Sequence, residues 1–256
     1  MANWIRYLAD GVEGFGTLEG TRIAEYRGAL FGEKSATGRT FELGGVQLLC
    51  PCEPSKVVAL WNNFHALGAK LGKAAPVHPL FLIKPGSSAI GSGAAIRRPA
   101  RYAGKIAFEG ELGIVIGRRC REVTPEEADA YIFGYTCVND VTSAQLLDED
   151  PNFAQWTRAK GSDTYSCIGP GIASTLDWRA AHVVTTVDDG ERQNYPLADM
   201  IFTPQQIVAA ISGDMSLLPG DVIACGTSLG VGSMKDGATV CVRIEGIGEL
   251  RNRLGA

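Results

Sequence analysis

The chain consists mainly of short apolar runs separated by glycines and polar turn formers. Runs of this kind, rich in β-branched and aromatic side chains, are typical of β-strands. The predicted strands lie within residues 16–26, 44–51, 56–61, 80–86, 111–117, 131–140, 182–191, 221–227 and 238–248. We therefore predict a mixed α+β fold dominated by strands, and not an alternating array of strands and helices.

Helical patterns are few, and two of them begin with the same pair of residues. Thr124-Pro125 and Thr203-Pro204 each precede a helix-like pattern. Threonine is a good N-cap, and proline fits the first helical position because its missing N–H has no partner there in any case. We predict helices over residues 124–132 and 203–215 that pack on the sheets.

The chain divides into a small N-terminal part and a larger remainder. Residues 1–52 form a predicted β module that ends in the turn-rich sequence CPCEPS, and residues 53–256 carry the candidate chemistry. The 256 residues, 45% of them hydrophobic, are enough for one substantial core beside such a module.

Charge and composition exclude several classes of partner. The net charge is −4, and the basic residues are scattered, so we expect no binding to nucleic acid or to an anionic membrane. No apolar stretch reaches the 18 residues of a membrane span, and the first residues carry charges at Arg6 and Asp10 and lack the apolar core of a signal peptide. We therefore expect a cytoplasmic protein. The seven cysteines include no C-x-x-C pair and are expected to be reduced and buried.

Three acidic residues, two in the strand-like segment 106–117 and one in the predicted strand 131–140, form a candidate metal site. Glu109 and Glu111 are two positions apart, so their side chains project from the same face of a strand. Asp140 ends the predicted strand 131–140. Carboxylates that converge repel one another unless a cation neutralises them, and Mg²⁺ or Mn²⁺ prefers such ligands. The pattern alone does not exclude that Glu109 and Glu111 lie on a solvated strand face and that Asp140 merely starts a turn.

Two further residues are candidates for catalysis. His65 follows the predicted strand 56–61, and its near-neutral imidazole suits a general acid or base, although a structural histidine gives the same pattern. Lys160 lies after a polar segment and is able to stabilise an enolate or a carboxylate, unless it is a surface lysine. His78 and His182 are expected to be structural.

The sequence 226–230, GTSLG, follows a predicted strand as the nucleophile of an α/β-hydrolase does. That motif needs a helix next, and here a glycine-rich segment follows; it also needs a later histidine, and none follows His182. We therefore reject a serine nucleophile. The loop still suits the binding of a substrate carboxylate at Thr227.

Seven segments in a fixed order identify a family resemblance. They are VVALWNNFHA, PLFLIKPGSS, FEGELGIVIG, FGYTCVNDVT, RAKGSDT, LPGDVIACGTSLGVG and IEGIGELRNR, between about residues 55 and 250. With these segments the chain resembles the fumarylacetoacetate hydrolase family, in particular its acylpyruvate hydrolase and hydroxymuconate isomerase/decarboxylase-like branch. The resemblance implies a β-roll around a metal site, a small N-terminal β module and a homodimer.

The resemblance also implies roles for particular residues. Glu109, Glu111 and Asp140 become ligands of Mg²⁺ or Mn²⁺, His65 and Lys160 become catalytic, and Thr164 and Thr227 become substrate-binding residues. One position departs from the family pattern. Many members carry a glutamate three residues after the histidine, where it supports water activation, and this chain has Gly68. An imidazole without that partner is a poorer base.

These observations predict a metal-dependent hydrolase for a small 2-oxo acid. The expected reaction cleaves a carbon–carbon bond of a 2,4-dioxo acid, an acylpyruvate such as fumarylpyruvate or maleylpyruvate, to pyruvate and a carboxylic acid. The alternative is a decarboxylase or an isomerase/tautomerase of oxaloacetate-like or 2-hydroxymuconate-like acids. A non-catalytic descendant is disfavoured by the intact acidic trio. The far end of the substrate is expected against residues 69–79 or 147–158.

Overall fold

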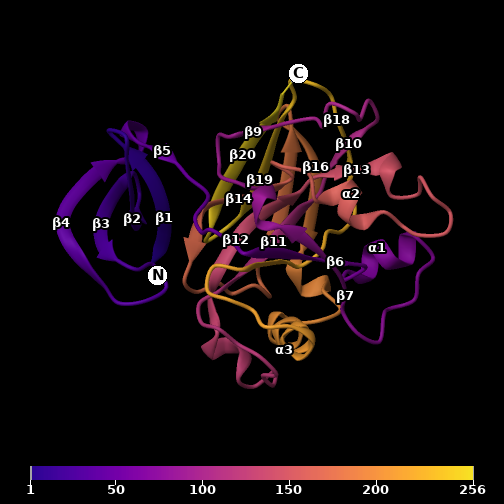
Figure 1. Cartoon of the computed structure of the whole chain (residues 1–256), viewed down its shortest axis with the longest axis horizontal. Coiled ribbons are helices and arrows are strands. Elements are labelled where there is room, and N and C mark those ends of the chain that lie inside the picture. Colours follow the sequence, from indigo (N-terminus) through magenta and orange to yellow (C-terminus); the bar gives the residue numbers. More distant parts are fainter. Residues whose placement is uncertain (1, 256) are drawn as a thin grey trace.

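The computed structural model describes residues 2–255, and its N-terminal strands form a separate antiparallel lobe (Figure 1). The strands are β1 (Asn3–Ala9), β2 (Val12–Glu19), β3 (Arg22–Gly28), β4 (Lys34–Glu42) and β5 (Gln47–Leu48). Alternate residues Ile5 and Tyr7 of β1 are buried with Ile23 of β3. Alternation places these side chains on one face, so they form a small core of their own.

The N-terminal strands continue into the largest sheet of the molecule. Its order is β4-β3-β2-β1-β14-β12-β11-β17-β6-β7, with β5 beside β1 and β8 beside β14. The further strands are β6 (Lys56–Trp61), β7 (Leu80–Pro85), β8 (Ala89–Ile90), β11 (Gly110–Ile116), β12 (Ile132–Asp140), β14 (Ser166–Ala173) and β17 (Val222–Ala224). Every residue of β11 is buried, as expected for a strand covered on both faces.

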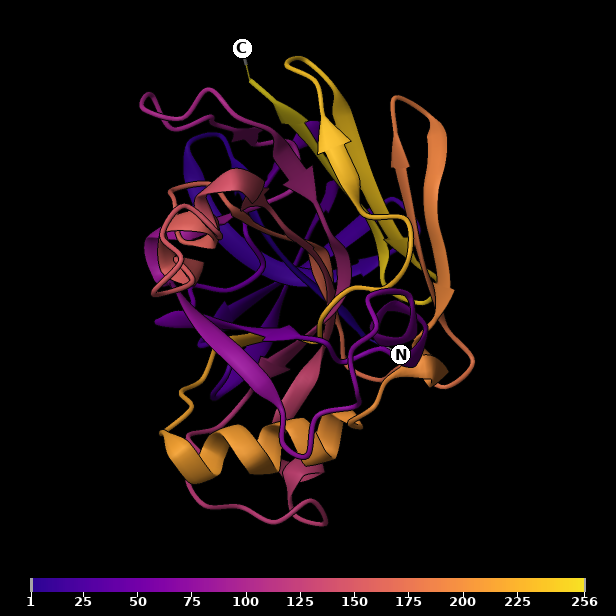
Figure 2. The same cartoon turned by 90° about the vertical axis from the view of Figure 1, so that its right-hand side faces the viewer.

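Two smaller sheets complete the β-structure. One has the order β16-β15-β19-β20-β9 and packs against β11, β12 and β14, and the other has the order β13-β10-β18. Figure 2 shows the long hairpins of the first sheet beside the central strands. The strands are β9 (Ala95–Ile96), β10 (Ile106–Phe108), β13 (Thr142–Ser143), β15 (His182–Val187), β16 (Gly190–Pro196), β18 (Gly232–Met234), β19 (Thr239–Ile244) and β20 (Gly248–Leu254).

The helices are short and lie around these sheets. The α-helices are α1 (His65–Lys70), α2 (Trp156–Lys160) and α3 (Pro204–Asp214). The 3-10 turns are η1 (Leu43–Gly45), η2 (Gly86–Ser88), η3 (Ala128–Ala130), η4 (Ala144–Leu146) and η5 (Leu197–Asp199). Within residues 2–255, none of the helices has the length and apolar character to cross a membrane.

One of the two predicted helices is confirmed, and the other is wrong. Helix α3 starts after Thr203, whose hydroxyl accepts from the backbone of Gln206 while the Gln206 side chain accepts from the backbone of Thr203. The segment 124–132 contains only the turn η3. The Tyr131 carbonyl accepts from the N–H of Gly117 at 2.7 Å, and Ile132 already pairs with Ile116. Sheet pairing therefore overrides the local helix signal.

The predicted fold class is confirmed, and the seven cysteines are all free. The N-terminal lobe is joined to the rest through β1, which pairs with β14 at Asn3–Ala173 and Trp4–Ile172. The lobe and the remainder therefore share one continuous sheet. The boundary between residues 52 and 53 stays a prediction.

Candidate active site

The acidic trio meets where two central strands end. Glu109 lies between β10 and β11, Glu111 lies in β11, and Asp140 is the last residue of β12. The N–H of Asp140 donates to the carbonyl of Glu109 at 2.9 Å, which fixes the two chain segments against each other. One carboxylate oxygen of each of the three residues lies within 4.8 Å of the others. This convergence is what a shared metal ion requires.

Glu111 has a buried oxygen with no partner. Its Oε2 accepts from the N–H of Gly226 at 2.8 Å, and its Oε1 has no hydrogen-bond partner among residues 2–255. Gly226 has φ +88°, a left-handed conformation that glycine adopts without strain. Burial, reinforced by Asp140 and then Glu109, raises the pKa of Glu111 well above its usual range. A divalent cation would supply the missing partner, so these residues fit a metal ion.

Two buried lysines neutralise part of the trio. The Lys160 ammonium donates to Asp140 at 2.7 Å, to Glu109 at 2.8 Å and to the hydroxyl of Thr142 at 2.7 Å. The Lys84 ammonium donates to the other oxygen of Asp140 and to the carbonyl of Tyr165. Burial alone would raise the pKa of Asp140, but the ammonium groups of Lys160 and Lys84 lower it below its usual value. Asp140 is therefore an anion.

The pKa of Lys160 responds to the same charges. Burial favours the neutral amine, but the carboxylates of Asp140, Glu109 and Glu111 raise the pKa of Lys160 above its usual range. In the absence of a cation Lys160 is thus an ammonium, and each of its three N–H groups has an acceptor.

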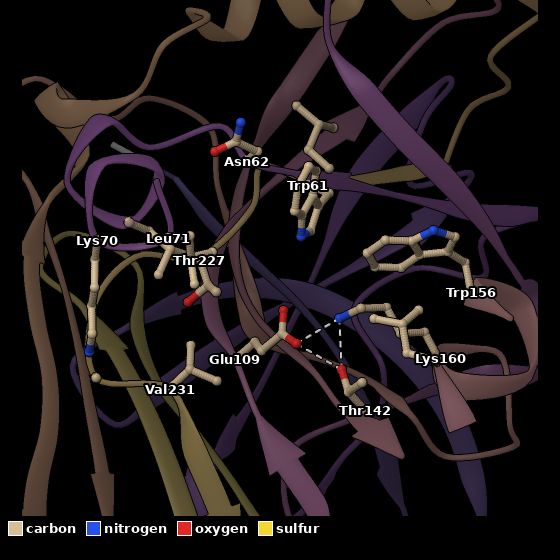
Figure 3. Close-up of a pocket in the computed structure, with 14 residues that line it drawn as sticks. Trp61, Asn62, Lys70, Leu71, Glu109, Thr142, Trp156, Lys160, Thr227 and Val231 are labelled. Carbon is tan, nitrogen blue, oxygen red and sulfur yellow. Dashed lines mark hydrogen bonds and ion pairs between the residues drawn. The ribbon is translucent and has the colours of Figure 1, made fainter. Parts of the chain in front are cut away.

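A cavity of about 320 Å³ opens beside the trio. Its lining residues are Leu60, Trp61, Asn62, Leu67, Lys70, Leu71, Glu109, Thr142, Leu147, Trp156, Lys160, Thr227, Gly230 and Val231. Figure 3 shows Glu109, Thr142 and Lys160 joined by hydrogen bonds at one end of this pocket. A small molecule in the pocket would therefore lie against the metal-binding side chains. The segments 69–79 and 147–158, which are expected to contact the far end of the substrate, both contribute residues to the lining.

The structure leaves His65 apart from this centre. His65 is the first residue of α1, and its side chain is exposed and is not among those that line the pocket. Gly68 is buried, and a Cβ atom at this position would lie 2.9 Å from the Oδ1 of Asn62. The place of a supporting glutamate is therefore closed by Asn62.

The two threonines have different surroundings. Thr227 lines the pocket, and its hydroxyl donates to the carbonyl of Gly110 at 3.0 Å and accepts from Gln193 at 2.8 Å. Thr164 lies outside the lining, and its hydroxyl accepts from the N–H of Arg97 at 2.8 Å. Only Thr227 is thus in position to contact a molecule in the pocket.

The rejection of a serine nucleophile is confirmed. After the loop that contains Thr227 and Ser228, the chain enters strand β18 instead of a helix. Ser228 is buried and does not line the pocket. The loop instead contributes the N–H of Gly226 and the side chain of Thr227 to the site.

Sequence reasoning did not identify Lys84 or the tryptophans of the pocket. Lys84 is the single charge in the apolar run 80–85. A lysine within such an apolar strand is buried only when it has a partner, so its position indicates a buried ion pair. Trp61 and Trp156 come from segments 95 positions apart (156 minus 61), and no local pattern indicates that they meet.

Comparisons with known proteins agree with this geometry. Residues 56–255 match the family model "Fumarylacetoacetate (FAA) hydrolase C-terminal", and residues 3–51 match "Rv2993c-like, N-terminal". Protein Rv2993c of Mycobacterium tuberculosis is 42% identical over 87% of this chain and 83% of its own length. Oxaloacetate tautomerase YisK of Bacillus subtilis is 30% identical over 84% of this chain and 75% of its own length.

A solved structure extends the comparison to the fold. The 2-hydroxyhepta-2,4-diene-1,7-dioate isomerase of Mycobacterium marinum superposes with a TM-score of 0.91 at 36% identity, over 100% of this chain and 98% of that chain. The match includes the N-terminal lobe as well as the strands that carry the acidic trio. The chain is therefore a member of the fumarylacetoacetate hydrolase family.

Proposed function

We propose that this protein is a divalent-metal-dependent enzyme that interconverts the keto and enol forms of a small 2-oxo acid. Lys160 carries the proposal: it is a buried ammonium shared by Glu109, Asp140 and Thr142 at the end of the pocket. Glu109, Glu111 and Asp140 would hold Mg²⁺ or Mn²⁺. A cation bound there would polarise the 2-oxo group and make the adjacent C3 protons more acidic.

The roles of the protein groups follow from their contacts. With Glu109 and Asp140 engaged by a cation, Lys160 has N–H groups free to donate to the substrate oxygen that becomes negative. The same positive charge would lower the pKa of Lys160 toward the range in which its Nζ atom can take the C3 proton and pass it to the 2-oxo oxygen, and the reverse transfers would restore the keto form. Thr227 and the neighbouring loop would orient the substrate carboxylate.

A keto–enol reaction requires no attacking water, and this agrees with the surroundings of His65. The imidazole is exposed, and Gly68 takes the position from which a glutamate would support it. The relatives named as a tautomerase and an isomerase support the same reaction class.

The second candidate is hydrolysis of a 2,4-dioxo acid to pyruvate and a carboxylic acid. The matched family is named after a hydrolase, and His65 belongs to α1, the helix that contributes Leu67, Lys70 and Leu71 to the pocket. This reaction would use His65 as the base that activates water. Decarboxylation of an oxaloacetate-like acid would need the same stabilised enolate.

Nuclear magnetic resonance in D₂O separates these reactions. The Mn²⁺-free, Mg²⁺-loaded protein should exchange the C3 protons of a 2-oxo acid for deuterium, without forming new carbon fragments. Lys160→Met should reduce exchange by at least about 100-fold. Lys160→Arg keeps the charge but cannot transfer a proton, and it should be equally inactive. Lys235→Met, which changes an exposed lysine, is the control.

Other products would change the conclusion. Pyruvate and a second acid formed from an acylpyruvate, with loss of activity in His65→Ala, would establish hydrolysis instead. Full activity of Lys160→Met would contradict the keto–enol mechanism as written. A homodimer stays a prediction, and light scattering after gel filtration measures it.

A further inference from the structure

The pocket has a charged end and largely apolar walls. Glu109, Thr142 and Lys160 form the charged end, and Figure 3 places Trp61 and Trp156 near Lys160, with Leu71 and Val231 across the pocket beside Thr227. The apolar lining residues are Leu60, Trp61, Leu67, Leu71, Leu147, Trp156 and Val231. A ligand held at the charged end would therefore extend between hydrocarbon surfaces.

The two tryptophans form the most extensive of these surfaces. Their ring centroids are 6.0 Å apart, and the rings meet edge to face at 60°. Trp61 ends β6, while Trp156 begins α2, the same helix that ends at Lys160. A single short helix thus sets both the ammonium at the charged end and one aromatic wall. Aromatic walls favour flat or branched apolar groups.

The mouth of the pocket exposes apolar side chains to water. Leu71 is 50% exposed and Val231 is 40% exposed. Exposed apolar surface beside a cavity is covered favourably by an apolar ligand, because water is released from both.

The charges of the site match one carboxylate. With Glu109, Glu111 and Asp140 ionised around a divalent cation, and with Lys84 and Lys160 as ammonium groups, the site would carry one net positive charge. A substrate with a single carboxylate neutralises it. A second carboxylate would have to leave water among apolar side chains, and the one further cation of the lining, the exposed ammonium of Lys70, would compensate that cost only weakly.

Two polar groups on the walls bear on such a second carboxylate. Asn62 is buried and uncharged, and its amide nitrogen already donates to the carbonyl of Ala74, so it supplies no counter-charge for a distal anion. Lys70 is exposed, and no ion pair or hydrogen bond of its ammonium exists within the described chain. Lys70 is thus the single group of the lining, apart from Lys160, that carries a positive charge for a distal anion.

We infer that the substrate is a 2-oxo acid with one carboxylate and an uncharged, bulky far end, an aryl or branched alkyl group that packs against the surface that Trp61 and Trp156 form together. The inference rests on the proposed function for the 2-oxo acid end. It narrows the substrate class, because fumarylpyruvate, maleylpyruvate and oxaloacetate all carry a second carboxylate.

Binding to the full-length, Mn²⁺-loaded protein tests the inference without relying on turnover. Calorimetry would compare 5-methyl-2-oxohexanoate with 2-oxoglutarate, which places a carboxylate where the first has an isopropyl group. Phenylpyruvate supplies the aryl probe, and oxalate and pyruvate report the charged end alone. The two apolar acids should bind at least about 10-fold more tightly than 2-oxoglutarate.

Variants connect this preference to the walls. Trp156→Ala should lower the affinity for phenylpyruvate by about 10-fold or more and leave the affinity for oxalate unchanged. Trp156→Leu, which keeps an apolar wall, should lower the affinity for phenylpyruvate less. Lys70→Gln should leave phenylpyruvate unchanged, and unaltered unfolding midpoints would show that the variants are folded. Tighter binding of 2-oxoglutarate, lost in Lys70→Gln, would overturn the inference alone. Failure of oxalate and pyruvate to bind would overturn the proposed function with it.

Discussion

Two fully buried carboxylates on neighbouring strands of the large sheet have opposite surroundings. Asp221, which precedes β17, accepts from the backbone N–H and hydroxyl of Ser55, the backbone and ammonium of Lys56, and the N–H of Leu218. Among residues 2–255, Glu111 in β11 accepts only from Gly226. Both charges cost desolvation, but only that of Asp221 is fully compensated within the protein. A buried carboxylate whose oxygens all have partners therefore holds chain segments together, whereas a buried carboxylate with an unpartnered oxygen is available to bind a ligand.

The largest effect on stability is expected for Asp221→Ala. The change leaves the donors of Ser55, Lys56 and Leu218 without their acceptor and should lower the free energy of unfolding by about 3–5 kcal/mol. Urea denaturation in the presence of a chelator measures it. Mn²⁺ affinity of the folded variant should stay unchanged, and a lost affinity would show that Asp221 acts on the metal site.

A somewhat smaller loss is expected for Lys84→Met. Lys84 contacts one oxygen of Asp140, and Lys160 contacts the other, so Asp140 keeps one compensating charge. We expect a decrease of about 3 kcal/mol in the free energy of unfolding, near the lower limit for broken buried pairs. Equal stability of Lys84→Met and the unchanged protein, measured in the same denaturant series, would argue against Lys84 as a necessary counter-charge.

Glu111→Gln should have the opposite effects to Asp221→Ala, because we expect it to weaken metal binding and leave the free energy of unfolding nearly unchanged. The change removes a buried acid whose Oε1 has no partner among residues 2–255, so stability in chelator should be unchanged or slightly higher. Mn²⁺ affinity should fall by at least about 100-fold, since even partners of ligating groups account for 10- to 100-fold. Calorimetric titration provides the measurement. Wild-type affinity in this variant would remove Glu111 from the metal site.

The smallest effect is expected at Arg6 on the N-terminal lobe. Its guanidinium donates to Glu13 at 2.9 Å and Glu53 at 2.6 Å, and these glutamates are 62% and 79% exposed. Exposed ion pairs contribute about 0–1 kcal/mol because water screens them. Arg6→Ala should therefore change the urea midpoint only slightly. A loss as large as that of Asp221→Ala would mean that exposure does not separate the two kinds of pair.

The sequence predicts features that depend on local signals. Helix α3 follows from Thr203, Pro204 and the apolar spacing after them, and β12 ends at Asp140 where the predicted strand ends. The acidic trio converges as expected from an alternate pair on one strand and a strand end. These features arise from periodicity and capping, which act over a few residues.

Features that depend on long-range packing could not be predicted from the sequence. The helix predicted at residues 124–132 gives way to pairing of Ile132 with Ile116. Lys84 is buried because Asp140 and Tyr165, from distant segments, accept from it. Its role is set by tertiary neighbours that a one-dimensional pattern does not contain.

Strand β14 links the small lobe to the chemistry. On one side it pairs with β1, and on the other its Ser166 pairs with Asp140 of the trio. An enzyme shortened to its catalytic part would have a bare backbone edge at Ile172 and Ala173, while β8 would still cover Ser166 and Cys167 beside Asp140. Exposed strand edges pair readily with strands of other molecules, so the lobe protects the end of β14 that lies away from the metal ligands against self-association.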